Sequence, residues 1–250
     1  MYHAVEDAVR PPQYKHFYVT KSEFDWQMQA LKRWGYTPIT CHSLRNALEN
    51  GQALPPKPVV LTFDDGYANL AHNVHPIMQG MSWPYTVFLV PQCIGKTNQW
   101  VEPEGYEPTP LLTWQQIETM ASEGFVDFQP HTATHPRLTQ IDVNLARSEM
   151  RDSRAELEQR LQKPMDILCY PYGNYNDSVV AAAREIGYTM AVTTDFGRAR
   201  PGDDLMRLPR ISVYHVPPVS VTYGIGSLNY AWRLRTRKDT RPAPMALLPD

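Results

Sequence analysis

The run Val59-Val60-Leu61-Thr62-Phe63-Asp64-Asp65-Gly66-Tyr67 joins a short apolar segment to two adjacent carboxylates and a glycine. Residues 59–63 predict a buried strand, and Gly66 predicts the turn that ends it. The carboxylates then emerge at the carboxyl end of the strand, where β/α barrel enzymes keep their catalytic groups. Neighbouring side chains at such a turn point in different directions, so one carboxylate can bind a metal while the other faces the water to be activated.

The rest of the chain repeats one plan of capped helix, terminal glycine and apolar strand. The helices are predicted to begin at Thr20, Thr113 and Asn176, to end at Gly35, Gly124 and Gly187, and to precede strands at 36–39, 125–128 and 188–193. A longer helix is predicted from about Asp142 to Leu161, with charges of both signs that indicate a solvated face. This alternation predicts an α/β barrel.

Two histidines follow the acid pair in the segment His131-Thr132-Ala133-Thr134-His135. Histidines spaced by four residues lie on one face of a helical turn, and a compact loop brings them together equally well. An aspartate and two histidines leave positions open for water and substrate, which is the catalytic pattern of metal sites. A lone pair of this spacing is usually structural, and a lone Asp-Asp-Gly is usually a turn. The combination predicts a metal-dependent hydrolase.

Composition is that of one globular domain and argues against a nucleic-acid partner. The chain has 250 residues, 42% of them hydrophobic and 20% charged, with a net charge of -2. A nucleic-acid-binding protein normally shows a dominant basic face, so no nucleic-acid partner is expected. Cys41, Cys93 and Cys169 are widely spaced, which suits a reducing compartment and fits no disulfide framework. Small buried apolar positions are expected for Cys41 and Cys93.

Three motifs carry a resemblance to a known family. The segments Thr62-Phe63-Asp64-Asp65-Gly66-Tyr67, His131-Thr132-Ala133-Thr134-His135-Pro136 and Tyr170-Pro171-Tyr172-Gly173 resemble the polysaccharide deacetylase family, also called the NodB-homology family or carbohydrate esterase family 4. The resemblance runs from residue 1 to about residue 215. It implies a distorted β/α barrel over residues 1–220, followed by a C-terminal helix and Pro-rich tail at 221–250. The implied activity removes N-acetyl groups from an amino sugar.

The resemblance also implies roles for individual residues. Asp64 matches the general base of the family. Asp65, His131 and His135 match its metal ligands, with zinc expected and cobalt, nickel, iron or manganese as alternatives. The backbone N–H of Tyr172 is expected to stabilise the tetrahedral oxyanion. Tyr67 and Pro171 are expected to line the substrate pocket.

The sequence departs from the common family pattern in three places. Cys169 stands where many members have an arginine that holds the base, so another group must orient Asp64 or its pKa will be higher than in those relatives. The motif expected near 193–197 matches poorly. The general acid is usually a C-terminal histidine, for which His215 is an approximate match. Met1-Tyr2-His3 resembles the start of the circularly permuted branch, which includes bacterial poly-N-acetylglucosamine deacetylases, so His3 is predicted as the acid with His215 in reserve.

The N-terminus raises a question about the first strand. A strand that ends at His3 should begin several residues earlier, so either it is short here or the true start lies upstream. The sequence opens with no basic region followed by an apolar core, and no run reaches the ~18 apolar residues of a membrane span. The chain as written is expected to be cytoplasmic, and a periplasmic or extracellular location is expected if the true start lies upstream.

Aromatic and basic segments suggest contacts with larger partners. Trp100 and Tyr106 lie in the Pro-rich segment 91–110 at the expected catalytic face, where they can line a glycan groove or pack within their own loop. The segment Trp232–Lys238 interleaves basic and apolar residues, which fits a membrane surface, a lipid carrier or a plain charged helix face. The predicted substrate is an N-acetylated hexosamine in a surface glycan or its precursor. A catalytically silent glycan-binding relative, or a formyl, imide or allantoin-type amidohydrolase, are the alternatives.

Overall fold

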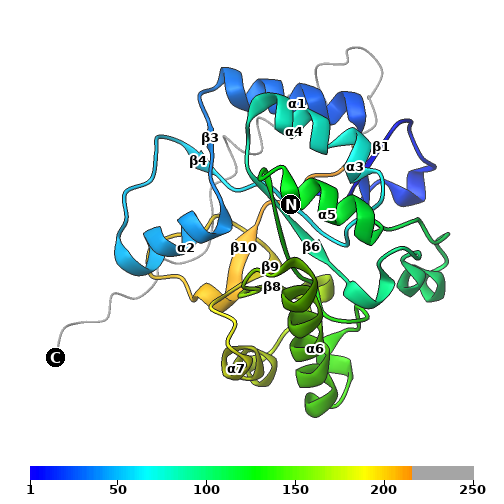
Figure 1. Cartoon of the computed structure of the whole chain (residues 1–250), viewed down its shortest axis with the longest axis vertical. Helices are drawn as coiled ribbons and strands as arrows, with labels where there is room; N and C mark the ends of the chain where they lie inside the picture. The colour runs from blue at the N-terminus through cyan, green and yellow to red at the C-terminus, as the bar shows by residue number, and fades with distance from the viewer. Residues whose placement is uncertain (216–250) are drawn as a thin grey trace.

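Short strands alternate with helices along residues 1–215, the part of the chain that this computed structural model describes (Figure 1). The strands are β1 Ala4–Glu6, β2 Tyr18–Thr20, β3 Thr37–Pro38, β4 Pro58–Val59, β5 Thr62–Phe63, β6 Tyr85–Leu89, β7 Val126–Pro130, β8 Ile167–Cys169, β9 Met190–Phe196 and β10 Leu208–Arg210. The α-helices are α1 Lys21–Arg33, α2 Cys41–Asn50, α3 Leu70–Asn73, α4 His75–Met81, α5 Trp114–Ser122, α6 Val143–Leu161 and α7 Asp177–Ile186. Single 3₁₀ turns are η1 Pro12–Tyr14, η2 Pro91–Cys93, η3 Gln99–Glu104, η4 Leu138–Gln140, η5 Pro171–Gly173 and η6 Leu205–Arg207.

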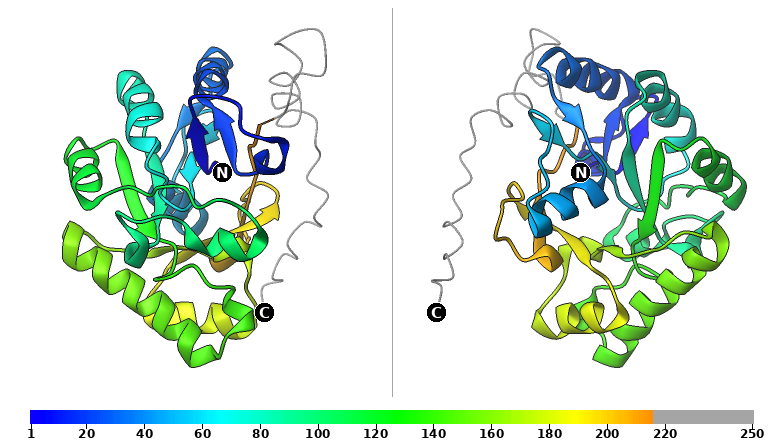
Figure 2. Two further views of the ribbon diagram at one scale, coloured as in Figure 1. Left: turned by 90° about the vertical axis from the view of Figure 1, so that its right-hand side faces the viewer. Right: turned by 60° about the vertical axis from the view of Figure 1, so that its left-hand side comes forward.

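All of these strands pair in parallel, and they form the wall of a distorted β/α barrel. The wall consists mainly of two three-stranded sheets, β5-β6-β7 and β10-β9-β8, while β1-β2 and β3-β4 form two-stranded pairs. Between β7 and β8, the buried Gln129 side chain accepts a hydrogen bond from Ile167 N at 3.1 Å. Helices α1, α4, α5, α6 and α7 surround the strands (Figure 2). The carboxyl ends of the parallel strands therefore share one face of the barrel.

The first residues of the chain close the ring between β5 and the segment after β10. Tyr2 N donates to Thr62 O at 2.8 Å, and Asp64 N donates to Tyr2 O at 2.9 Å. On the other side, Val213 N donates to Met1 O at 2.9 Å. The acid pair after β5 is thereby brought next to the end of β10.

Local sequence signals explain the helix boundaries. Thr20 Oγ1 accepts from Glu23 N at 3.2 Å, and the Glu23 carboxylate accepts from Thr20 N at 2.8 Å, so the predicted capping box forms at the start of α1. The same reciprocal pair caps α5. The long helix is α6, with Asp142 as its cap. At the end of α7, Gly187 has a φ of 100°, which favours glycine, and a Cβ there would lie 2.6 Å from Arg154 Nη1.

One prediction about the strands was wrong, and the other holds only in its shortened form. The sequence predicts one strand over residues 59–63, but the structure divides it, because β4 pairs with β3 whereas β5 pairs with β6. The sequence also predicts a strand that ends at His3. Instead, Tyr2 forms a single bridge to Phe63, and β1 begins at Ala4 because it pairs with β2.

Two further expectations concern single residues and the C-terminus. Cys41 is buried as predicted, whereas Cys93 is only partly buried. Both the predicted C-terminal segment 221–250 and its cluster Trp232–Lys238 lie outside the described residues. No helix among residues 1–215 is long and apolar enough to cross a membrane.

Candidate active site

Three buried side chains from two loops converge at the carboxyl ends of β5 and β7. Asp65 follows β5, His131 follows β7, and His135 lies in the loop after it. Asp65 Oδ1 lies 3.4 Å from His131 Nε2 and 3.3 Å from His135 Nε2. Each residue offers one potential ligand atom, and these atoms all lie within 4.8 Å of one another. The structure thus brings together the three residues that the sequence predicts as metal ligands.

Sharp backbone turns aim these side chains inward. Asp65, Thr132, His135 and Tyr172 have φ values of 72°, 65°, 68° and 57°, in the left-handed region that side chains other than glycine rarely adopt. Such conformations cost roughly 1–3 kcal/mol each and persist where the surrounding structure enforces them. Four such residues lie in three loops around one point. This clustering marks this end of the barrel as a functional site.

The chemistry of the three groups fits a cation. His131 Nδ1 lies 2.8 Å from the Cys169 carbonyl, which can only accept, so Nδ1 is the donor and Nε2 faces Asp65. The two facing atoms repel unless Nε2 carries a second proton or a cation lies between them. His135 Nδ1 is buried and has no hydrogen-bond partner among the described residues. A nitrogen, nitrogen and carboxylate set of this kind suits zinc and similar divalent ions, and the His131 carbonyl contact is the usual support of a ligating histidine.

Asp64 is held by an arginine that sequence reasoning missed. Arg210, at the end of β10, donates from Nη1 to Asp64 Oδ1 and from Nη2 to Asp64 Oδ2, both at 2.7 Å. Its Nε donates to Thr193 O at 2.9 Å. Burial raises the pKa of Asp64, but the charge and hydrogen bonds of Arg210 outweigh burial and bring that pKa down to about 2. A carboxylate at this position therefore stays ionised at neutral pH.

Cys169 occupies the position where the resemblance predicts an arginine. Its Sγ lies 3.2 Å from Arg210 Nη2 and 3.5 Å from Asp64 Oδ2. Burial raises the pKa of the Cys169 thiol in spite of the nearby guanidinium, so the sulfur stays protonated. The small thiol leaves the space that the Arg210 side chain fills. The one sequence signal for Arg210 is a single charge within the apolar run 208–211.

Aromatic rings enclose His135 on two sides. Trp100 stacks on its ring at 4.3 Å between centroids, and Tyr172 meets it at 4.6 Å. Arg137 lies over the Tyr172 ring, with Cζ 3.7 Å from the centroid, and its Nη2 pairs with Glu104 Oε1 at 2.9 Å. We call the pair Arg137–Glu104 the clasp, because it joins the turn that carries Trp100 to the turn that carries Tyr172.

The two candidate acids lie in different surroundings. The half-buried His3 packs edge-on to Phe17, with 6.5 Å between the ring centroids. Burial and Arg210 have the largest effects on the pKa of Asp64, and the charge of His3 lowers that pKa further. His3 is therefore within electrostatic reach of the acid pair. His215 instead stacks on Tyr18 at 5.1 Å, and its Nδ1 lies 3.0 Å from Glu23 at the start of α1.

The other predicted substrate contacts are placed as follows. Tyr67 is buried, its hydroxyl accepts from Asn98 Nδ2 at 3.0 Å, and burial together with the charge of Asp65 raises its pKa well above 10. Pro171 is buried at the start of η5. Tyr106 packs against Tyr14 and Phe17 at 5.4 Å and 5.1 Å, which is the loop-packing alternative, whereas Trp100 lies at the site.

Comparisons with known proteins agree with this geometry. Residues 51–191 match the family described as polysaccharide deacetylase. The chain is 28% identical over 207 residues to the poly-β-1,6-N-acetyl-D-glucosamine N-deacetylase of Staphylococcus epidermidis, a match that covers 80% of this chain and 69% of that relative. Among solved structures, the Streptococcus pyogenes deacetylase PplD in complex with acetate is 30% identical with a TM-score of 0.72, covering 85% of this chain and 90% of that one. IcaB from Ammonifex degensii shares the fold at 22% identity, with a TM-score of 0.76 over 92% of this chain and 94% of its own.

Proposed function

Because the chain belongs to the polysaccharide deacetylase family, we propose that it hydrolyses the N-acetyl groups of N-acetylhexosamine units in a bacterial surface glycan or its carrier-linked precursor. The observation that carries this proposal is the division of labour within the acid pair. Asp64 is buried and held ionised by Arg210, while its neighbour Asp65 turns toward His131 and His135. One carboxylate is thus placed for proton transfer and the other for binding a cation.

We assign Asp65, His131 and His135 as the residues that hold a divalent ion, with zinc expected from the donor set. A bound ion would polarise the acetamide carbonyl and lower the pKa of the attacking water. The remaining steps fall to side chains and backbone groups of the chain itself.

Asp64 takes a proton from the attacking water as the water oxygen adds to the acetamide carbon. Arg210 fixes both carboxylate oxygens, so the base cannot rotate away from the water. The backbone N–H of Tyr172, set by its left-handed φ of 57°, donates to the resulting oxyanion and contributes a few kcal/mol to transition-state stabilisation. His3 then protonates the amine as the C–N bond breaks, and acetate and the free amino sugar leave.

The experiment that tests this proposal measures acetate release and metal content on matched variants of the acid pair. With β-1,6-linked N-acetylglucosamine oligosaccharides as substrate, Asp64→Asn should keep its metal and lose turnover by about 10²-fold or more, because loss of a general base typically costs that much. Asp65→Asn should lose both metal and turnover. Equal metal loss in the two variants, or full turnover by Asp64→Asn, would refute the division of roles.

A second pair of variants identifies the acid. His3→Ala should keep metal and substrate binding but lower kcat sharply, because the amine is a poor leaving group without a proton. His215→Ala should have a mild effect, since its described contacts are Tyr18 and Glu23. The reverse pattern of kcat values would make His215 the acid.

A further inference from the structure

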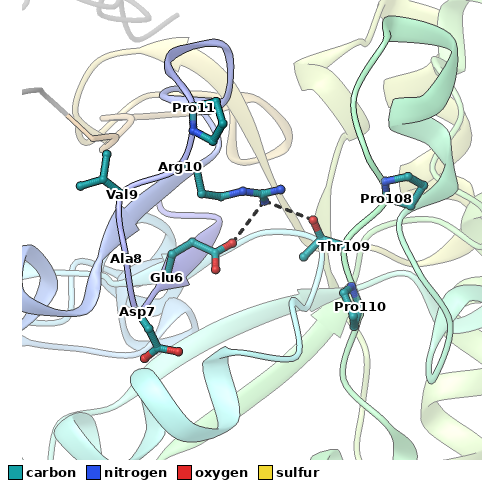
Figure 3. A pocket seen from close by; sticks show the side chains of 9 residues that line it. All are labelled: Glu6, Asp7, Ala8, Val9, Arg10, Pro11, Pro108, Thr109 and Pro110. Atoms are coloured by element: carbon teal, nitrogen blue, oxygen red, sulfur yellow. Dashed lines mark hydrogen bonds and ion pairs between the residues drawn. The ribbon is translucent and has the colours of Figure 1, made fainter.

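An open groove lies beside the loop that carries the acid pair. It is bounded by residues 6–11, from the last residue of β1 onward, and by residues 108–110, with a cavity of about 500 Å³ between them (Figure 3). Its second wall is paired with the chain just after Asp65, since Ala68 N donates to Pro110 O at 2.9 Å and Tyr67 bridges to Leu111. The groove and the candidate active site are therefore neighbours on the same face of the barrel.

Arg10 crosses the groove with part of its hydrogen-bonding capacity unused. Its Nη1 donates to Glu6 Oε1 at 3.3 Å and to Thr109 Oγ1 at 3.2 Å, and its Cζ lies 4.2 Å from the Tyr14 ring centroid (Figure 3). Among the described residues, Nε and Nη2 of this guanidinium have no acceptor. Three contacts thus fix the guanidinium, while its remaining N–H groups are available to a ligand.

The other groups in the groove match the surface of a sugar. The carboxylates of Glu6 and Asp7 accept hydrogen bonds from hydroxyl or ammonium groups, and the Asp7 side chain is 72% exposed. Pro108 and Pro110 supply apolar surface for the C–H face of a pyranose ring. Two carboxylates against one guanidinium leave the groove with net negative charge, which disfavours phosphate or uronate ligands and suits a neutral or amine-bearing sugar.

Buried hydrogen bonds join the groove to the loop that carries Asp65. Thr109 N donates to Asn98 Oδ1, Asn98 Nδ2 donates to the Tyr67 hydroxyl at 3.0 Å, and Tyr67 follows Asp65 by two residues in the chain. Asn98 and Tyr67 are only 2% and 3% exposed. Buried and satisfied polar links of this kind are rigid, so the distance from the groove to the reaction site is fixed. A fixed distance is what a polymer with a regular repeat requires of two subsites.

We propose that this groove is a second sugar-binding subsite, which takes a neutral or amine-bearing hexosamine unit of the same glycan chain at a distance from the acetyl group under attack. The inference rests on the proposed function for the identity of the glycan. It makes Arg10, Glu6 and Thr109 determinants of polymer binding with no part in the chemical step. Short substrates occupy the reaction site alone, whereas longer ones reach both sites and gain affinity from the second.

Calorimetric binding of an oligosaccharide ladder tests the subsite without turnover. The titrations use the full chain with Asp64→Asn and β-1,6-linked N-acetylglucosamine oligomers from the disaccharide to the hexasaccharide. We expect the hexasaccharide to bind about tenfold or more tightly than the disaccharide, and we expect Arg10→Ala or Thr109→Val to abolish that gain while leaving disaccharide affinity unchanged. Arg151→Ala is the matched control, because Arg151 is an exposed arginine on α6.

The outcomes separate the subsite from the proposed function. Any of three results would overturn the subsite. The affinity could be equal for all oligosaccharide lengths, Arg10→Ala could weaken disaccharide and hexasaccharide binding equally, or Arg151→Ala could cause the same loss of affinity as Arg10→Ala. Acetate release by the unaltered chain is scored separately on the disaccharide. Failure there would refute the proposed deacetylation, while the binding ladder would still decide whether the groove takes a sugar.

Discussion

At the scale of single residues, the site depends on an exchange between Cys169 and Arg210. The family resemblance predicts a guanidinium from the strand that ends at Cys169, but the structure supplies it from β10. The carboxylate of Asp64 receives the same bidentate support from another direction, and a neutral thiol fills the vacated position. Asp64 therefore has a guanidinium partner although residue 169 is a cysteine.

Replacement of Arg210 tests this exchange. In Arg210→Gln, burial still raises the pKa of Asp64 while the largest opposing influence is gone, so activity on the acid side should fall at higher pH than in the parent, and kcat should drop by roughly 10²-fold. Breaking a buried pair also costs about 3–5 kcal/mol of stability, so folding is checked by thermal melting. Cys169→Ser is the control, because it leaves the Arg210–Asp64 pair in place. An unchanged pH–rate profile in Arg210→Gln would contradict the assignment.

At the scale of secondary-structure elements, turns rather than strands shape the walls of the site. The turn η3 stacks Trp100 on the ring of His135, and η5 brings Tyr172 into an edge contact with the same ring. The η5 turn is also pressed against β9, since a Cβ on Gly173 would lie 2.0 Å from Thr194 Oγ1. The ring of His135 is therefore oriented by packing, since its Nδ1 has no hydrogen-bond partner within residues 1–215.

The clasp between these turns can be tested by charge exchange. The side chains of Arg137 and Glu104 are 39% and 38% exposed, so the pair should contribute at most about 1 kcal/mol. Arg137→Glu and Glu104→Arg should each reduce kcat/KM by about two- to fivefold, and the double variant should recover most of the loss. Additive losses in the double variant would show that the two residues act independently.

Helix α2 is attached to the barrel by a histidine whose effect depends on pH. His42 Nε2 lies 3.0 Å from Asp166 Oδ1, and His42 Nδ1 lies 3.6 Å from the Asp127 carboxylate. The hydrogen bond to Asp166 has the largest effect on the pKa of His42 and raises it above 6.5. A raised pKa in the folded state stabilises the fold below pH 6.5, and this contribution is lost as pH rises through the folded-state pKa. In urea unfolding, His42→Gln should therefore be less stable than the parent by under about 1 kcal/mol in acid and equally stable in base. His72→Gln, at an exposed histidine, is the control; a difference that persists in base would refute the pH linkage.

At the scale of the whole molecule, the candidate ion site joins loops from separate parts of the barrel. Asp65 follows β5, whereas both histidines follow β7. A ligand that binds the folded chain and not the unfolded one stabilises it by mass action. Purified protein should carry nearly one divalent ion per chain, and chelation should lower its Tm reversibly by several degrees. His135→Ala should melt like the chelated parent and show no response to chelator; a chelator response equal to that of the parent would contradict the ligand set.

Features that depend on nearby residues could be predicted from the sequence, whereas features that depend on distant residues could not. The capping box of Thr20 and Glu23 and the ligand spacing of His131 and His135 are local, so they could be predicted from short segments. Asp64 and Arg210 are 146 residues apart in the sequence and pair only because the barrel closes, so no local pattern predicts this pair. The break between β4 and β5 is likewise decided by which strands lie beside them.

Closure of the ring by β10 has a consequence for protein synthesis. Both acids and both histidines have been synthesised once residue 135 is added, whereas the guanidinium that holds Asp64 is added only with β10. Because chains fold as they are made, Asp65, His131 and His135 are present in a nascent polypeptide well before Asp64 gains its partner. With Asp64 as the proposed base, we expect acetate release only from chains translated through Arg210, so that it would report closure of the barrel.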